Sequence, residues 1–130
     1  VYTSCDDCLT PVTPPQQIIT SASAFMQPCV GGTGINDYMG ASVILDVPVT
    51  VDTTINVIVY YQYANSYIPC NNTLSNNNQT SFDVFVPAGE AFGAVDACTQ
   101  GQYFSTGANI CGACISGSNN PNINFGTYGC

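Results

Sequence analysis

Eight cysteines constrain this chain of 130 residues more than any other feature, because no histidine accompanies them. An even number of cysteines at this density, without histidine, is typical of disulfides formed in an oxidising compartment. We therefore predict that all eight form disulfides: Cys5, Cys8, Cys29, Cys70, Cys98, Cys111, Cys114 and Cys130. Eight cysteines can pair in many ways, so the sequence does not predict which cysteine bonds to which.

Two Cys-x-x-Cys pairs, Cys5/Cys8 and Cys111/Cys114, raise two alternatives to structural disulfides. Four thiolates can bind zinc, but far more residues separate these two pairs than separate the pairs of ordinary zinc sites. A redox Cys-x-x-Cys pair needs a helix N-terminus, and the sequence predicts none at either pair. Structural disulfides are therefore favoured, and no residue is predicted to bind a transition metal.

The chain contains no lysine, arginine or histidine, and its 8 acidic residues give a net charge of −8. Without a basic patch, binding to nucleic-acid phosphates is excluded. Without histidine there is no Ser-His or Cys-His base, so we predict no catalytic residue and no enzyme, a carboxylate-pair hydrolase being the remaining alternative. The carboxylates are interpreted as solvated, with Ca²⁺ binding as the alternative; they are Asp6, Asp7, Asp37, Asp46, Asp52, Asp83, Glu90 and Asp96.

Strict alternation of apolar residues predicts strands at 43–51, 55–63 and 82–86. The residues between the first two strands, 52–54, predict a tight turn, so we expect these two strands to form a hairpin. Pro48 in the first strand predicts an edge position or a bulge, because proline donates no hydrogen bond to a sheet.

Short strands separated by Gly, Pro and Asn, without helical periodicity, predict an all-β fold of the β-sandwich or jelly-roll kind, stapled by disulfides. Residues 16–130 are expected to form this single domain. Residues 1–15 contain Pro11, Pro14 and Pro15, and proline favours extended backbone. We therefore predict an extended N-terminal arm over residues 1–15.

The arm suggests a route to self-assembly. Cys5 and Cys8 lie on it, away from the predicted core, which makes them candidates for disulfides to a neighbouring subunit. Residues 16–26, or the arm before them, are also candidates to add as a strand to a neighbour's sheet. The alternative is that residues 16–26 form the first strand of their own sheet.

Three positions are candidates for glycosylation. Asn71 and Asn78 each begin an Asn-x-Thr sequence in a polar loop, which is the acceptor pattern for N-linked glycans. Thr53, in the sequence Asp-Thr-Thr, resembles short acidic sites of O-glycosylation. Glycans would suit a surface that carries so few charges.

The chain begins at Val1, without Met or a leader, and contains no apolar run long enough to span a membrane. We therefore expect a secreted protein whose leader has been removed. The sequence VFVPAG at residues 84–89 is similar to strand ends of extracellular bacterial and phage β-sandwich domains. Over residues 41–115, the composition rich in Asn, Thr, Tyr and Cys resembles surface-appendage (pilus or filament) subunits and phage fibre proteins. The resemblance implies no site residue.

These observations together predict a structural subunit of an extracellular filament or pilus-like appendage, whose partners are copies of itself. Its arm would join neighbouring subunits by strand addition, by disulfides or by both. One alternative is a virion surface component such as a fibre, spike or decoration protein. A further alternative is a secreted module that binds glycans or a cell surface.

Overall fold

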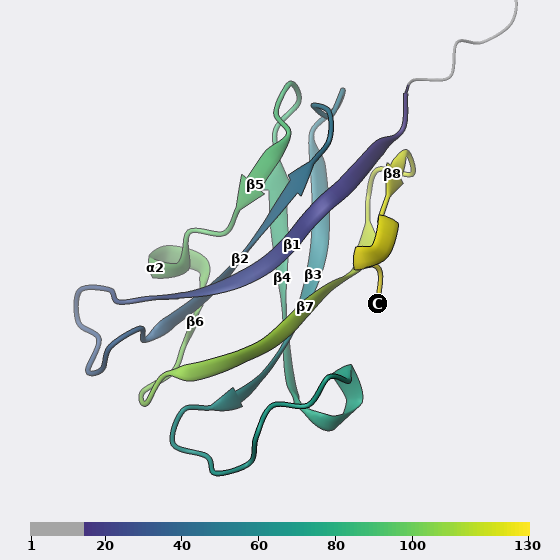
Figure 1. The fold of residues 1–130 in the computed structure, drawn as a ribbon. Helices are drawn as coiled ribbons and strands as arrows, with labels where there is room; N and C mark the ends of the chain where they lie inside the picture. Colours follow the sequence, from purple (N-terminus) through teal and green to yellow (C-terminus); the bar gives the residue numbers. More distant parts are fainter. Residues whose placement is uncertain (1–14) are drawn as a thin grey trace, which may run out of the picture.

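Two β-sheets make up the computed structural model, which describes residues 15–130 (Figure 1). The first sheet has the order β5-β2-β1-β8, and β6 also pairs with β2. Its strands are β1 (Gln17–Gln27), β2 (Tyr38–Leu45), β5 (Phe92–Ala94), β6 (Gln102–Tyr103) and β8 (Ile123–Asn124). The second sheet has the order β4-β3-β7, formed by β3 (Thr53–Tyr63), β4 (Asn78–Val86) and β7 (Ala108–Ser118).

The core lies between the two sheets. Inner-face residues of the central strand β3 are fully buried at Ile55, Val57 and Val59, and they join one apolar cluster with the inner faces of β2 and β4. Burying such side chains contributes about 25 cal/mol for each Å² removed from water, which is the main stabilisation of the domain. The predicted strands at 55–63 and 82–86, and the all-β, disulfide-stapled single domain, are confirmed.

The predicted hairpin is wrong. β2 ends at Leu45, and β2 and β3 belong to different sheets, because residues 46–52 cross from one sheet to the other. The alternation of residues 43–51 does not continue on one face: Val49 is buried, whereas Val51 is 54% exposed. Pro48 explains the break, since it donates no hydrogen bond to a ladder.

Residues 16–26 lie mostly in β1, which pairs antiparallel with β2 from Ile19 to Gln27. The structure therefore supports the alternative to strand donation, in which this segment forms the first strand of its own sheet. The arm prediction falls on residues 1–14, which lie outside the described residues.

In the described part of the chain, three short helices accompany the sheets: η1 (Leu74–Asn76), α2 (Ala97–Gln100) and η2 (Gly126–Tyr128). The Asp96 carboxylate caps α2 by accepting a hydrogen bond from the Cys98 N–H at 3.1 Å. These helices are too short for a 3.6-residue period to show in the sequence.

The sandwich has two distinct ends (Figure 1). The arm end is where β1 begins, and it includes loops 46–52 and 87–91, which are joined by the Val49 N–H donating to Glu90 O at 2.9 Å. The distal end consists of loops 28–37, 64–77 and 104–107.

Candidate assembly surface

Three disulfides staple residues 15–130, the part that the structure describes: Cys29–Cys98, Cys70–Cys111 and Cys114–Cys130. Six of the eight predicted disulfide cysteines are thus paired. Cys111 and Cys114 bond to different partners, which overturns both the zinc and the redox interpretation of that Cys-x-x-Cys pair. Cys5 and Cys8 lie outside the described residues, so their assignment as intersubunit cysteines stays a prediction.

The two predicted N-glycosylation sites differ in their surroundings. Asn71 is exposed in loop 64–77, which the Cys70–Cys111 disulfide ties to β7. Asn78 is also exposed, but it is the first residue of β4 and is paired with Tyr61. Both stay predictions, and both acceptor nitrogens are hydrogen-bonded in the folded domain: Asn71 Nδ2 donates to Asn76 O at 3.1 Å, and Asn78 Nδ2 donates to Gln62 Oε1 at 3.4 Å.

Asn77 is the hydrogen-bonding centre of the asparagine-rich loop. Its Nδ2 donates to the carbonyl oxygens of Asn71 and Thr73 at 3.0 and 2.8 Å. Its Oδ1 accepts from the Asn71 N–H at 3.2 Å and from Gln62 Nε2 at 3.0 Å. Nothing in the asparagine-rich sequence distinguishes Asn77 from its neighbours.

Replacing Asn77 by Ala is expected to destabilise the protein by about 1–3 kcal/mol, because four hydrogen-bonding partners lose their bonds and Gln62 is buried. Urea unfolding of the full chain measures the change. Asn76→Ala is the matched control, since the exposed Asn76 contributes its backbone to the loop. Equal stabilities for the two variants would contradict this role of Asn77.

Thr53, the predicted O-glycosylation site, is fully buried in the folded domain. Its Oγ1 donates to Val51 O at 2.9 Å and lies 3.0 Å from Asn120 Nδ2, which donates to it. The folded chain therefore does not present this hydroxyl to an enzyme, and the structure does not support modification at Thr53.

The sequence-based interpretation that all the carboxylates are solvated is wrong for Asp37. Asp37 is fully buried, and both of its carboxylate oxygens accept the Gly34 N–H, at 2.9 and 3.0 Å. A Cβ on Gly32 would lie 1.8 Å from this carboxylate, so only glycine lets the loop close around it. Within residues 15–130, no three side chains of His, Cys, Asp or Glu come together as a metal site.

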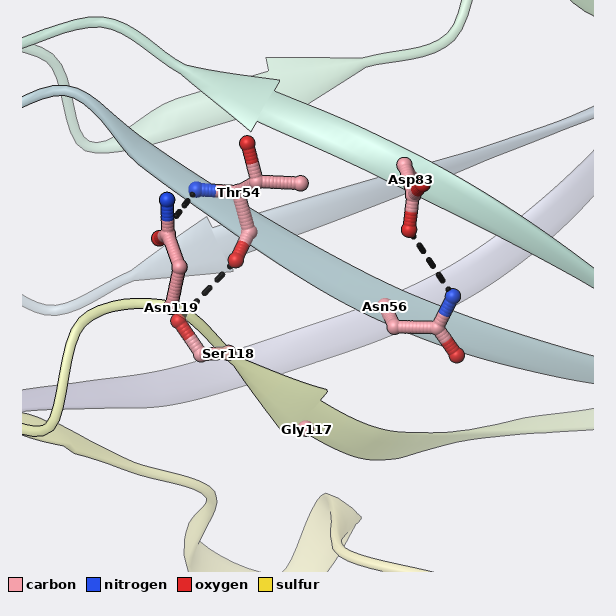
Figure 2. A pocket seen from close by; sticks show the side chains of 6 residues that line it. All are labelled: Thr54, Asn56, Asp83, Gly117, Ser118 and Asn119. Carbon is pink, nitrogen blue, oxygen red and sulfur yellow. Dashed lines mark hydrogen bonds between the residues drawn. The ribbon is translucent and has the colours of Figure 1, made fainter.

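A polar hollow of about 330 Å³ lies on the outer face of the second sheet (Figure 2). Asn56 Nδ2 donates to Asp83 Oδ1 at 2.9 Å, and Asn119 Oδ1 accepts the Thr54 N–H at 2.8 Å. The lining groups bond largely to one another, and none of the lining residues is aromatic. We assign no ligand to this hollow.

Tyr61 and Tyr63 of β3 form an aromatic cluster with Phe104 of loop 104–107, and the three rings lie within 6 Å of one another, centroid to centroid. Burial of the Tyr61 ring, together with its contact with the Tyr63 hydroxyl, raises the pKa of the Tyr61 phenol. The Tyr61 hydroxyl is therefore neutral at physiological pH and packs as part of the core.

Two neighbouring strand edges are largely unpaired in the described part of the chain. The outer edge of β1 pairs with β8 only at Gln17 and Ile18, and the outer edge of β7 forms a single bridge, at Ile115. The C-terminal residues make both of these contacts, at the arm-end half of the two strands. Towards the distal end, neither edge pairs with another strand in residues 15–130, as the positions of β1 and β7 in Figure 1 allow the reader to follow.

We call the remaining free edges, residues 21–27 of β1 and residues 108–114 of β7, the open side. Apolar side chains of the inner faces are only half-buried along it, although they pack against the core: Ala24, Met26, Ala108, Ile110 and Ala113. A free strand edge beside incompletely covered apolar side chains is the arrangement to which an added strand binds.

Comparisons with protein-family models, with curated proteins and with solved structures find no match to this chain. No helix in the described residues is long and apolar enough to cross a membrane. The three disulfides are consistent with an extracellular location.

Proposed function

We propose that this protein is the repeating structural subunit of an extracellular filament, in which residues 1–15 of one copy add as a strand to the open side of the next. The observation that carries this proposal is the free edge of β1 beside half-buried apolar side chains. An added strand would pair with the β1 backbone and cover Ala24 and Met26, and both contributions favour binding.

The other long edge of the molecule is less suited to an added strand. β4 is the edge strand of the second sheet, yet its inner-face residues Phe82, Val84 and Val86 are already buried. A strand added to β4 would gain backbone hydrogen bonds but would cover little apolar surface. The open side offers both.

The two ends of this contact lie at opposite ends of the domain. The arm precedes β1 at the arm end, whereas the open side begins at Ser21 of β1 and runs to the distal end. A contact between two different surfaces of the same chain is heterologous, and its repetition builds an open filament unless the rotation closes a ring. The geometry therefore favours a head-to-tail polymer.

The arm has a suitable length and composition. The edge from residue 21 to 27 runs about 23 Å at roughly 3.3 Å per residue, and residues 1–10 contain no proline that would interrupt pairing. If extended, the proline-rich residues 11–16 would span a further distance of about 19 Å at roughly 3.1 Å per residue. All cysteines in residues 15–130 are bonded to one another, so none of them is available to Cys5 or Cys8 without disulfide exchange.

Negative-stain electron microscopy of the native, unreduced protein tests the proposal. We expect uniform filaments, and we expect an excess of a synthetic peptide of residues 1–15 to reduce their number, whereas a peptide of scrambled sequence does not. Dispersed particles of 13.6 kDa would contradict the proposal. Closed shells containing nucleic acid would favour the virion alternative instead.

A further inference from the structure

The distal end exposes large apolar side chains from separate loops. Val30 and Ile35 of the β1–β2 loop are 106% and 85% exposed, and Tyr67 of the β3–β4 loop is 98% exposed. Ile68 and Tyr103 are also exposed at this end. We call these five residues the distal patch. The loops that carry them meet at Gly107, where an added Cβ would lie 3.6 Å from both Ala64 Cβ and Ile35 O. Single exposed apolar residues are normal, but several on adjoining loops indicate an interaction surface.

The loops that carry the distal patch are held in place. The Cys29–Cys98 disulfide anchors the start of loop 28–37, and the Cys70–Cys111 disulfide anchors loop 64–77. Thr33 Oγ1 lies 3.1 Å from the Tyr103 hydroxyl, and the Ala64 N–H donates to Gly107 O at 3.1 Å. The loop backbones that carry the patch are therefore tied to the sheets at several points, which reduces the entropy that these loops lose when a partner binds.

Charge divides the two ends of the domain. The distal loops contain one carboxylate, Asp37, and it is buried. At the arm end, Asp46, Asp52 and Glu90 are all exposed. Because the chain has no basic side chain, a contact between two arm ends would bring carboxylates together without a partner of opposite charge.

We infer that the distal patch is a docking surface for the arm end of another copy of this chain. The inference rests on the proposed function, since it concerns a second contact between subunits that the arm already joins. The open side of the accepting copy runs to its distal end. When the arm of a second copy occupies that open side, the arm end of the second copy lies near the distal patch of the first. Val47 and Val51, which are 36% and 54% exposed, give that arm end apolar side chains to pack against the patch.

Two single substitutions in the full chain test this inference. Ile35→Asp and Tyr67→Asp each add one carboxylate to the patch, and both sites are exposed enough for the monomer to fold. Ser81→Asp adds the same charge on the exposed face of β4 and is the matched control. The readouts are the mass of protein in filaments after sedimentation and the binding of fluorescent peptide 1–15 to the unassembled chain.

We expect both patch variants to lower the mass in filaments at least about tenfold relative to Ser81→Asp, because an unpaired carboxylate would be buried against acidic neighbours. Peptide binding should be unchanged, because the open side is intact. Filaments that form equally well from patch and control variants would overturn this inference alone. A wild-type chain that neither binds the peptide nor assembles would overturn the proposed function and the inference with it.

Discussion

Replacing Ala24 by Asp is expected to abolish filament assembly, whereas replacing its neighbour Ser23 by Asp is expected to leave assembly intact. Ala24 points from β1 into the half-buried inner face of the open side, while Ser23 points to the exposed outer face of the same strand. An added strand would bury the new carboxylate at residue 24 only, and the chain holds no Lys, Arg or His to pair with it.

The size of this effect follows from the cost of burying a charge. A buried carboxylate without a partner costs several kcal/mol, and about 3 kcal/mol already weakens association more than a hundredfold. In the unassembled chain the same carboxylate lies at a half-buried position beside a free edge, where water reaches it. The variant should therefore fold and fail to assemble, which circular dichroism and sedimentation measure separately.

The opposite strand of the open side gives a second test. Ala113 of β7 is also half-buried, and Ala113→Asp should reduce assembly in the same way. Should Ala24→Asp fail to fold, Ala113→Asp decides the outcome. Normal filaments from a folded open-side variant would show that strand addition does not occur at this side.

The alternating pattern of residues 55–63 predicts β3 correctly because this strand is central, with one face buried in the core from Thr53 to Tyr61. The same pattern at residues 43–51 fails after Leu45. Val49 is buried, but it belongs to the loop that crosses between the sheets and not to a strand. A buried position favours an apolar residue in a loop as much as in a strand. Periodicity is therefore a better guide to which residues are buried than to which strands pair.

The candidate assembly surface was only partly predictable. The sequence indicates that the first strand and the arm before it matter for assembly, but it does not show which strand edges stay free. That depends on the path of residues 123–130, which cover the arm-end half of β1 and β7 and leave the other half uncovered. The burial of Thr53 and Asp37 was equally hidden, because polar residues carry no periodic signal when hydrogen bonds satisfy them inside the fold.

Cysteine pairing is a further property that only the fold reveals, and it leads to the second large prediction. Replacing both Cys29 and Cys98 by Ser is expected to lower the free energy of unfolding by about 4 kcal/mol, since this disulfide closes a sequence separation of 69 residues. Removing Cys114–Cys130, with a separation of 16 residues, should cost about 3 kcal/mol. Urea unfolding of the full chain measures both.

The two double variants also separate stability from assembly, because the disulfides hold different parts of the open side. Cys29 follows the distal end of β1 and ties it to α2, so its loss should loosen the free edge and the distal loop together. Cys130 instead holds the C-terminal residues against β7. We therefore expect the Cys29/Cys98 variant to lose assembly at urea concentrations where it is still folded, and the Cys114/Cys130 variant to retain assembly until it unfolds. Parallel loss of assembly in both variants would mean that the disulfides act through global stability and that the order of the β1 edge does not limit assembly.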